Sequence, residues 1–343
     1  MTAVQATGAL SSSSASATTT AAAATAYIRR DGRTALELRG KEMRLSELAA
    51  FDGSSWYAQG QTAVMVSLHG PTLSRNEAYD TCQVRVQVQH AHQRTPSAGG
   101  AERAIYEEMK LELLTRTDAF ELESLLESTI DAVFIRDRFP RCVLVVDVVV
   151  VQDDGSLPAV ALNAVMCALL DAGLPCRTTM AAVSVAAVSH ADGGASSSLS
   201  SPSSTGAVAS GSNVEFLLDP TCGEETLGLG HHAAGNGASA AVAEKGDLSG
   251  SANAGAGPTA LLRRDAGLAL QDQYRCISTG VFVFSNPSCG GGLLAQLVRR
   301  RGGHDGAPAG AALSLEAYAQ MLALAERAAA VLFEFFRQCN VAV

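Results

Sequence analysis

The sequence predicts an α+β fold with mixed sheets, and three features of its pattern support this. Apolar runs rich in β-branched residues, typical of strands, occur in groups along the chain. Segments with apolar residues at intervals of three and four, typical of helices, lie between and after these groups. Tracts of small residues separate the ordered segments. Grouped strands with helices between them are the pattern of an α+β domain.

Length and charge limit the class of protein. The chain has 343 residues and a formal net charge of −9, which allows one large or two small domains. The negative charge argues against a uniformly basic surface that coats nucleic acid, although it allows a local basic groove. No apolar run approaches the roughly 18 residues of a membrane span, and no secretory signal precedes the first strand. We therefore expect a soluble intracellular protein without a membrane partner.

Four tracts rich in Ala, Ser, Thr and Gly have too few apolar residues to form a core. They cover residues 1–26, about 191–212, about 229–258 and about 289–310. Removing them leaves roughly 240 residues, the size of one large domain. The expected organisation is a disordered tail over 1–26 and one domain over 27–343, interrupted by the other three tracts.

Strands are expected throughout the segments before residue 90. Arg33–Arg39 alternates loosely, and Ser54–His69 predicts two strands broken at Gly60. A turn at His69–Thr72 ends the second of them. Cys82–Gln89 alternates most regularly, which predicts a half-buried strand with a polar face.

Four further strands are expected after residue 140. Val143–Val151 is a continuous β-branched run, typical of a strand covered on both faces. Met180–Val188 and Cys276–Phe284 are strand-like runs of the same length, and Asn213–Leu218 is a shorter one.

Three segments have helical spacing. The first runs from Glu102 to about Phe134, and the last runs from Ser314 to Cys339. The middle helix begins at Pro158, which suits a first helical position, and ends at Gly173.

The cysteines and histidines indicate neither a metal site nor a redox site. None of the eight cysteines has the C-x-x-C spacing of a zinc or dithiol motif. His90 and His92 are two ligands at most, which do not make a site. We expect buried, reduced thiols, no metal and no cofactor.

Several short motifs occur in a defined order, and together they resemble the RNase PH family, most closely its eukaryotic exosome-ring members. The resemblance covers about residues 29–220 and the terminal helix. Its motifs, in chain order, are RDGR at 30–33, DGSSWYAQGQT at 52–62, LHGP at 68–71, FPR at 139–141, QDDGS at 152–156, LNA at 162–164, LDAGLP at 170–175 and LDPT at 218–221.

The resemblance implies a fold and a chemistry. The fold is a single RNase PH-like domain of the ribosomal protein S5 domain 2-like type. Family enzymes are phosphorolytic 3′-to-5′ exoribonucleases, in which inorganic phosphate attacks the terminal phosphodiester. Such a site needs arginines or a helix N-terminus to hold phosphate, and acidic residues to place a metal or handle a proton.

The phosphate-binding positions of the family are degenerate in this sequence. Leu157 and Pro158 stand where family enzymes carry Thr and Arg, and proline also lacks a backbone donor. Asp118 falls near the position of a second family arginine, with Arg116 two residues away.

The acidic positions of the family are filled. Asp219 and Glu225 have the family spacing of six, although Asp219-Pro220-Thr221 resembles the inactive ring subunits. A turn acid and a solvated acid are the alternative interpretation of this pair. One acidic pair without a phosphate cradle does not support phosphorolysis.

The resemblance therefore predicts a catalytically silent subunit that scaffolds the exosome core and threads RNA. It implies related RNase PH-like subunits in a six-membered ring, cap subunits with KH and OB-type domains, a separate hydrolytic exoribonuclease, and RNA as partners. It also implies localisation in the nucleus and nucleolus, and in the cytoplasm. One alternative is an active phosphate-dependent exoribonuclease that uses Arg116, Asp219 and Glu225. Another is a free-standing RNA-binding protein.

Candidate RNA contacts follow from the polar face of the strand before residue 90 and the loop after it. Arg85, Arg94 and Arg103 lie on or beside this face, and salt bridges between subunits are the alternative use for them. Arg299-Arg300-Arg301 is either a solvated charge run or a site for RNA or targeting.

Overall fold

A computed structural model describes residues 29–74, 79–91, 119–190, 214–227, 274–300 and 313–341. Within these ranges, strands form a five-stranded sheet of order β1-β2-β3-β5-β4 and a four-stranded sheet of order β7-β6-β8-β9. Only β4 runs parallel to its neighbour, β5, so the first sheet is mixed as predicted. The strands are β1 (Lys41–Leu45), β2 (Gly53–Gln59), β3 (Thr62–Leu73), β4 (Gln83–His90), β5 (Cys142–Gln152), β6 (Met180–His190), β7 (Val214–Leu218), β8 (Tyr274–Ser285) and β9 (Gly292–Arg300).

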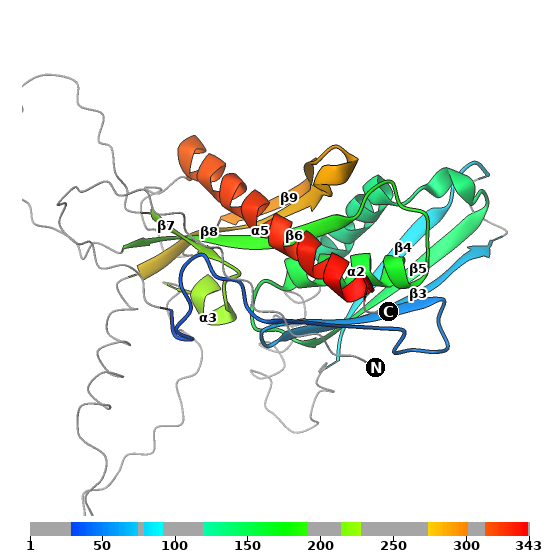
Figure 1. Ribbon diagram of the computed structural model, residues 1–343, viewed down its shortest axis with the longest axis horizontal. Helices are drawn as coiled ribbons and strands as arrows, with labels where there is room; N and C mark the ends of the chain where they lie inside the picture. Colours follow the sequence, from blue (N-terminus) through cyan, green and yellow to red (C-terminus); the bar gives the residue numbers. More distant parts are fainter. Residues whose placement is uncertain are drawn as a thin grey trace, which may run out of the picture.

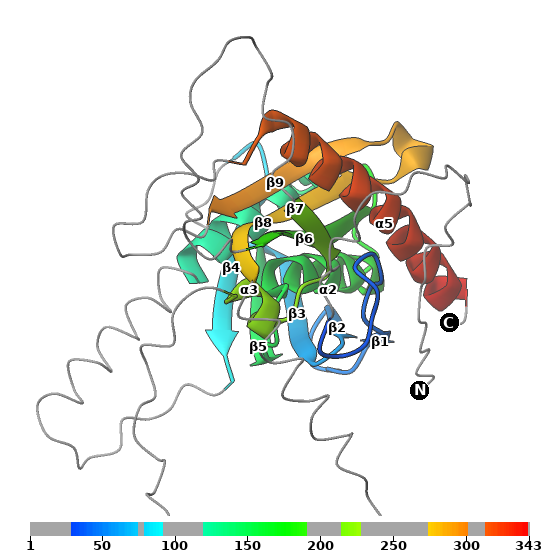
Figure 2. The ribbon, with the colours of Figure 1, turned by 90° about the vertical axis from the view of Figure 1, so that its left-hand side faces the viewer.

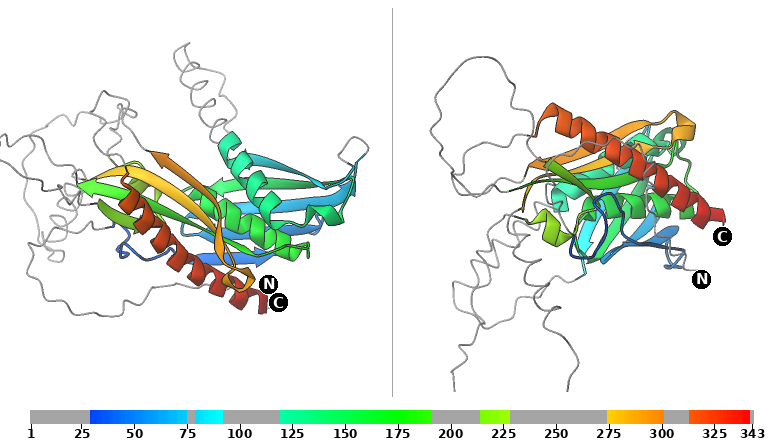
Figure 3. Two further views of the ribbon diagram at one scale, coloured as in Figure 1. Left: turned by 90° about the horizontal axis from the view of Figure 1, so that it is seen from above. Right: turned by 60° about the vertical axis from the view of Figure 1, so that its left-hand side comes forward.

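The two sheets enclose α2 (Leu157–Asp171), while α5 (Leu315–Val341) crosses the outer face of the second sheet (Figures 1 and 2). A helix over 119–133 lies beside α2, on the side of the second sheet opposite α5 (Figure 3). Short helical turns complete the described chain: η1 (Arg136–Arg138), α3 (Cys222–Glu225) and η2 (Pro287–Cys289).

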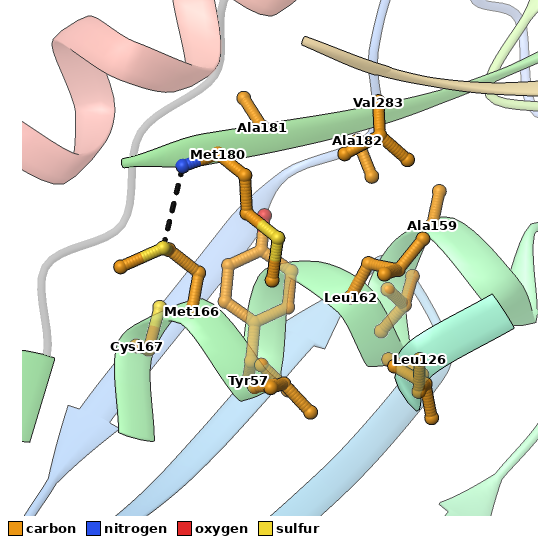
Figure 4. Close-up of a cluster of buried hydrophobic side chains, with 14 of the residues drawn as sticks. Tyr57, Leu126, Ala159, Leu162, Met166, Cys167, Met180, Ala181, Ala182 and Val283 are labelled. Carbon is orange, nitrogen blue, oxygen red and sulfur yellow. Dashed lines mark hydrogen bonds between the residues drawn. The ribbon is translucent and has the colours of Figure 1, made fainter. Parts of the chain in front are cut away.

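The central position of α2 follows from its sequence. It carries no charged residue before its last position, so it has no face that requires water. Met166, Leu162 and other α2 side chains pack between Tyr57 of the first sheet and Met180 of the second (Figure 4). Asn163, the buried polar residue of this helix, exchanges two hydrogen bonds of 2.8 and 3.0 Å with the backbone of Ala182. The LNA motif thus joins α2 to β6.

The long terminal helix is held at both ends by aromatic contacts. Near its start, the rings of Tyr318 and Phe282 lie 6.0 Å apart on the outer face of the second sheet. Near its end, Phe335 and Phe336 contact Tyr57, with ring centroids 6.4 and 6.3 Å apart. This helix therefore connects the two sheets and is confirmed close to its predicted limits.

Most predicted strands are confirmed, but the first one is wrong. Residues 33–39 form turns, with the Glu37 N–H bonded to the Thr34 carbonyl, and β1 begins at Lys41. Long-range hydrogen bonds from Arg29 and Arg39 to the second half of the chain fix this segment instead. The turn predicted at His69–Thr72 is also wrong, because β3 continues past it to Leu73 after a shift in register.

The strand predicted to be covered on both faces is covered on one. Leu144, Val146 and Val148 of β5 are fully buried toward the helices. Val145 and Val149 point the other way and are half-buried, because no described segment covers that face. The continuous run of β-branched residues in β5 therefore indicates a strand, but it does not indicate that both faces of the strand are buried.

The fourth low-complexity tract is partly wrong. Residues 292–300 form β9, which pairs with β8 along its length, and the preceding residues form η2. Gly290 and Gly291 adopt positive φ in the turn between them, so the glycines mark a turn and the leucines after it belong to a strand. The tail over 1–26 and the tracts at about 191–212 and 229–258 lie outside the described residues, as does 102–118 of the first predicted helix.

All eight cysteines are free thiols, and five of them are buried. The expectation of buried cysteines is thus met for five of them, whereas Cys176 is half-buried and Cys222 and Cys289 are exposed. Among the described segments, no helix has the length and apolar character needed to cross a membrane.

Candidate functional site

The candidate site lies where three turns meet at the amino end of α2. These are the turn after β5, the turn between β7 and α3, and the N-terminal segment, which we define as residues 29–40. Gly155 allows the turn after β5 and the turn before α3 to approach each other closely. Its φ is +88°, and a Cβ at this position would clash with the backbone N of Cys222 at 2.5 Å. The Cys222 N–H donates to the Asp154 carbonyl at 2.9 Å and joins the first two turns.

Asp219 is buried and forms an ion pair with Arg39. Its Oδ1 lies 2.7 Å from Nη2 and its Oδ2 lies 3.0 Å from Nε. The backbone N–H of Arg39 donates to Oδ2 as well, at 2.9 Å. Burial alone raises the pKa of Asp219, but the hydrogen bonds and charge of Arg39 outweigh it and hold this pKa below its ordinary value. The carboxylate is ionised and committed to a structural partner.

Arg39 also organises the turn before α2. Its guanidinium donates to the carbonyls of Asp154 and Gly155 at 3.0 and 3.1 Å. Thr62 supports the same turn, since its Oγ1 donates to the Gly155 carbonyl and accepts from the Asp154 N–H. One arginine thus ties the acidic turn to the start of the helix.

A second buried ion pair lies beside the first. Arg29 Nη2 and Nε contact the two carboxylate oxygens of Glu224 at 2.7 and 2.8 Å. Arg29 also donates to the carbonyls of Leu218 and Asp219, both at 2.9 Å. With Thr221, Glu224 forms a capping box at the start of α3. Because both Glu224 oxygens are bonded to Arg29, this ion pair fixes the relative orientation of the two side chains as well as attracting them to each other.

Glu225, the second predicted acid, reaches the amino end of α2. Its Oε1 accepts a 2.9 Å hydrogen bond from the N–H of Ser156, the N-cap residue. The Ser156 hydroxyl does not cap the helix, because it donates to the Pro220 carbonyl instead. Glu225 therefore supplies the negative group that the N-cap side chain does not.

A small cavity opens next to these groups. Its volume is about 40 Å³, enough for a water molecule or two and far too small for a nucleotide. Pro158, the second residue of α2, closes one side, and Arg299 of β9 reaches in from another. The full lining is Pro158, Ser184, Glu225, Thr279, Gly280, Val281, Leu297 and Arg299.

Arg299 also contacts the helix over 119–133. Its guanidinium forms a salt bridge with Glu121, near the described start of that helix. Leu157, at the first position of α2, packs against the hydrophobic core and brings no charge to the site. Neither Leu157 nor Pro158 therefore supplies the hydroxyl or the guanidinium that the family enzymes carry there.

The structure places Leu157, Pro158, Asp219 and Glu225 around the amino end of α2, where the resemblance puts the family's phosphate-binding and acidic positions. Arg85 is elsewhere, on the exposed face of β4. The other predicted residues, Arg94, Arg103, Arg116 and Asp118, lie outside the described part of the chain. Within that part, no group of three or more His, Cys, Asp or Glu side chains is arranged to hold a metal ion.

Sequence reasoning missed Arg29, Arg39 and Glu224. The first two lie on either side of the RDGR motif, and Glu224 adjoins a predicted acid, so charge near recognised motifs was a usable signal. Arg299 was considered only as part of the 299–301 charge run, and its place beside this site was not predicted.

Comparison with known proteins agrees with this fold. Residues 37–175 match the model of the 3′ exoribonuclease family, domain 1, named RNase_PH. Exosome complex component RRP41 of Bos taurus is 31% identical over 201 residues, which are 57% of this chain and 75% of that protein. The RRP46 homolog of Caenorhabditis elegans is 29% identical over 199 residues, 56% of this chain and 70% of that protein.

A solved structure extends the likeness to most of the chain. The crystal structure of rice (Oryza sativa) Rrp46 superposes with a TM-score of 0.55 and 19% identity. The superposition covers 90% of this chain and 98% of that one. The architecture of two sheets around a central helix is therefore that of a known fold.

Proposed function

The chain belongs to the RNase PH family of 3′ exoribonucleases, and from this premise we propose that it is a non-catalytic structural subunit of an RNA exosome core. In this role it scaffolds a ring of RNase PH-like subunits and helps to thread RNA toward 3′-to-5′ processing. Cap subunits with KH and OB-type domains and a separate hydrolytic exoribonuclease complete the proposed assembly. Its proposed compartments are the nucleus, the nucleolus and the cytoplasm.

The observation that carries the proposal of inactivity is the state of the amino end of α2. A phosphorolytic site must hold phosphate beside the scissile bond, and losing one such charged contact commonly costs about a hundredfold or more in rate. Here Leu157 and Pro158 bring no charge, and the carboxylate of Glu225 is bonded to the helix end. Asp219 is occupied by Arg39. The amino end of α2 therefore offers few positively charged or donor groups that could bind phosphate.

The uncovered face of the first sheet supports a role in an assembly. Trp56, Met65, Val145 and Val149 are half-buried on the face that no described segment covers. Apolar side chains on such a face favour association. The isolated chain is expected to self-associate or to be poorly soluble, and a monodisperse monomer at high concentration would contradict the proposed assembly.

Direct RNA contact is proposed for Arg85, together with Arg94 and Arg103. Arg85 projects from the exposed face of β4, where an arginine can contact a phosphate. Replacing each by Ala should reduce RNA crosslinking to this subunit and the dependence of RNA affinity on salt. Unchanged crosslinking, with loss of a neighbouring subunit instead, would assign these residues to subunit contacts.

The decisive experiment uses the complex purified through a tag on this chain. Its composition should include related RNase PH-like subunits in equal amounts. With and without phosphate, wild-type complex and complex carrying Glu225→Gln should degrade RNA equally. Release of nucleoside diphosphates that needs phosphate and disappears with Glu225→Gln, in a complex that still assembles, would establish the active exoribonuclease instead.

A further inference from the structure

The uncovered face of the first sheet carries an acidic side chain, Asp147 of β5, and we propose that it binds a basic side chain of a neighbouring subunit. Figure 1 shows α2 on the other side of this sheet. The occupant that we infer is the surface of a different protein, on which an arginine or lysine is surrounded by apolar side chains. The inference rests on the proposed function, which it deepens by stating the chemistry of the partner.

Asp147 lies among apolar side chains. Its strand has a neighbour on each side, so the carboxylate is not at an edge of the sheet. Val145 and Val149 precede and follow it on the same face, because successive side chains of a strand alternate. Met65 of β3 pairs with Val149, and Trp56 of β2 pairs with Met65. A charged group therefore interrupts a surface that is otherwise suited to burial.

No described group neutralises this charge. The side chain of Asp147 is half-buried, and among the described residues it takes part in no hydrogen bond or ion pair. Its partners across the two neighbouring strands, Ser67 and Gln87, are uncharged. The arginine of β4, Arg85, lies two residues before Gln87 and forms no ion pair with Asp147. The counter-charge must come from outside these segments.

The solitary carboxylate limits what can cover this face. A purely apolar surface would remove it from water without a partner, which is strongly unfavourable. A phosphate group placed at Asp147 would be repelled by its charge, so a protein surface is favoured over RNA at this position. An arginine or lysine supplies the missing charge, and an arginine can bond to both carboxylate oxygens. Asp147 thereby selects a basic partner, while the surrounding apolar side chains provide area.

The test uses the complex purified through a tag on this chain. Asp147→Lys reverses the charge, so the amount of one neighbouring subunit that copurifies should fall by about tenfold or more. Asp147→Asn keeps the size of the side chain, and the same subunit should be released at lower salt than from the wild-type complex. Because Asp147 has no partner within the described chain, both full-length variants should keep the wild-type midpoint of urea unfolding.

Glu326→Lys is the matched control, since it makes the same charge change at an exposed position of α5. It should leave the composition and the salt resistance of the complex unchanged. An equal loss of the subunit in Glu326→Lys would overturn the proposal, because the effect would then follow from net charge and not from the place of Asp147.

Photo-crosslinking identifies the surface that covers Asp147. A photo-crosslinking amino acid in place of Gln87, which is exposed beside Asp147, should crosslink to a different subunit within the complex. The crosslinked peptide should contain an arginine or lysine, and changing that residue to Asp should restore the subunit to the Asp147→Lys complex. Crosslinks only to RNA, to a second copy of this chain or to the same chain would overturn the inferred occupant. Absence of rescue would overturn the charge pairing.

The failure of this inference is distinguishable from failure of the proposed function. Asp147→Lys and Asp147→Asn complexes with the wild-type composition and salt resistance would overturn the role of Asp147 and leave the proposed subunit role intact. A wild-type complex that contains no RNase PH-like subunits would overturn the proposed function itself.

Discussion

Arg39 and Asp219 form a buried ion pair in which both carboxylate oxygens are used, at 2.7 Å from Nη2 and 3.0 Å from Nε. The two residues are 180 positions apart, so the pair links the N-terminal segment to the turn after β7. The same guanidinium holds the turn before α2. The acid that matches a family catalytic position is thus part of the framework of this chain.

Removing one partner of this pair should destabilise the protein strongly. Asp219→Asn leaves the Arg39 charge buried without its counter-ion, so the free energy of unfolding should fall by about 3 kcal/mol or more. Urea denaturation of the full chain measures it. The double substitution Arg39→Met with Asp219→Leu should lose less than the sum of the single changes. Additive losses would show that the two side chains are not coupled.

The same pair predicts the response to acid. The pKa of Asp219 is below its ordinary value of 3.8, so the folded state holds this proton less tightly than the unfolded chain does. Its contribution to stability is therefore complete above about pH 4 and is lost as the pH falls through the folded-state pKa. Asp219→Asn should remove this part of the acid dependence.

Lys41 predicts a second rise of stability with pH, at alkaline pH. Burial lowers the pKa of its ammonium group from 10.5 to about 8, although the charge of Asp219 acts against this shift. The unfolded chain therefore binds the proton more tightly, and stability should rise as the pH increases from about 8 to 10.5. Below pH 8 the charged lysine costs up to about 3 kcal/mol.

Lys41→Met tests this explanation. At pH 7 the substituted chain should be more stable than the wild type by about 1–3 kcal/mol, and its stability should no longer rise between pH 8 and 10.5. Chemical denaturation at several pH values measures both effects. A variant that is less stable at pH 7 would show that the ammonium group makes a net favourable interaction in the fold.

Local signals predicted the parts of the fold that local sequence determines. The start of α2 at Pro158 and its apolar residues are visible in the sequence, and the helix appears as expected. The segment 33–39 also has strand-like alternation. Its conformation is fixed by Arg29 and Arg39, whose partners lie 195 and 180 residues away, and no local pattern contains that information.

The candidate site divides in the same way. The resemblance to the family implied one site for Asp219, Glu225 and the start of α2, and in the structure both acids lie at that end of the helix. It did not indicate that Asp219 would face Arg39 and Glu225 the helix end, because these directions depend on the turns that meet at Gly155. Arg299 lies on β9, a strand that was not predicted because its segment has the composition of a low-complexity tract.

Gly53 should be essential for the packing of α2 on the first sheet. A Cβ at this position would lie 2.6 Å from Cβ of Ala172 and 2.9 Å from the Ala168 carbonyl oxygen. Gly53→Ala should therefore lower the free energy of unfolding by about 2 kcal/mol or more, because the backbone itself must move. Gly223→Ala is the matched control, since its nearest neighbour atom is 4.0 Å away. Equal stability of the two variants would contradict this account of α2 packing.

The last prediction concerns the exposed edge of β4. This strand is at the end of the first sheet, where unpaired N–H groups invite another strand. Two carboxylates from the helix over 119–133 cover it: Glu123 accepts from the Val88 N–H at 2.9 Å, and Glu127 accepts from the Val86 N–H at 3.3 Å. The two acids are one helical turn apart, so they can reach alternate residues along the strand.

Replacing both Glu123 and Glu127 by Ala should open this edge. A hydrogen bond to a charged acceptor contributes roughly 1.5–3 kcal/mol, so the Val86 and Val88 amides should exchange with solvent at least tenfold faster. Hydrogen exchange followed by mass spectrometry on a β4 peptide measures this. Glu121→Ala is the control on the same helix, because its carboxylate binds Arg299 and not β4. The open edge should also increase self-association with concentration, since an unpaired strand can add to a second copy. Unchanged β4 exchange in the double variant would show that solvent already satisfies these amides and that the carboxylates do not protect the edge.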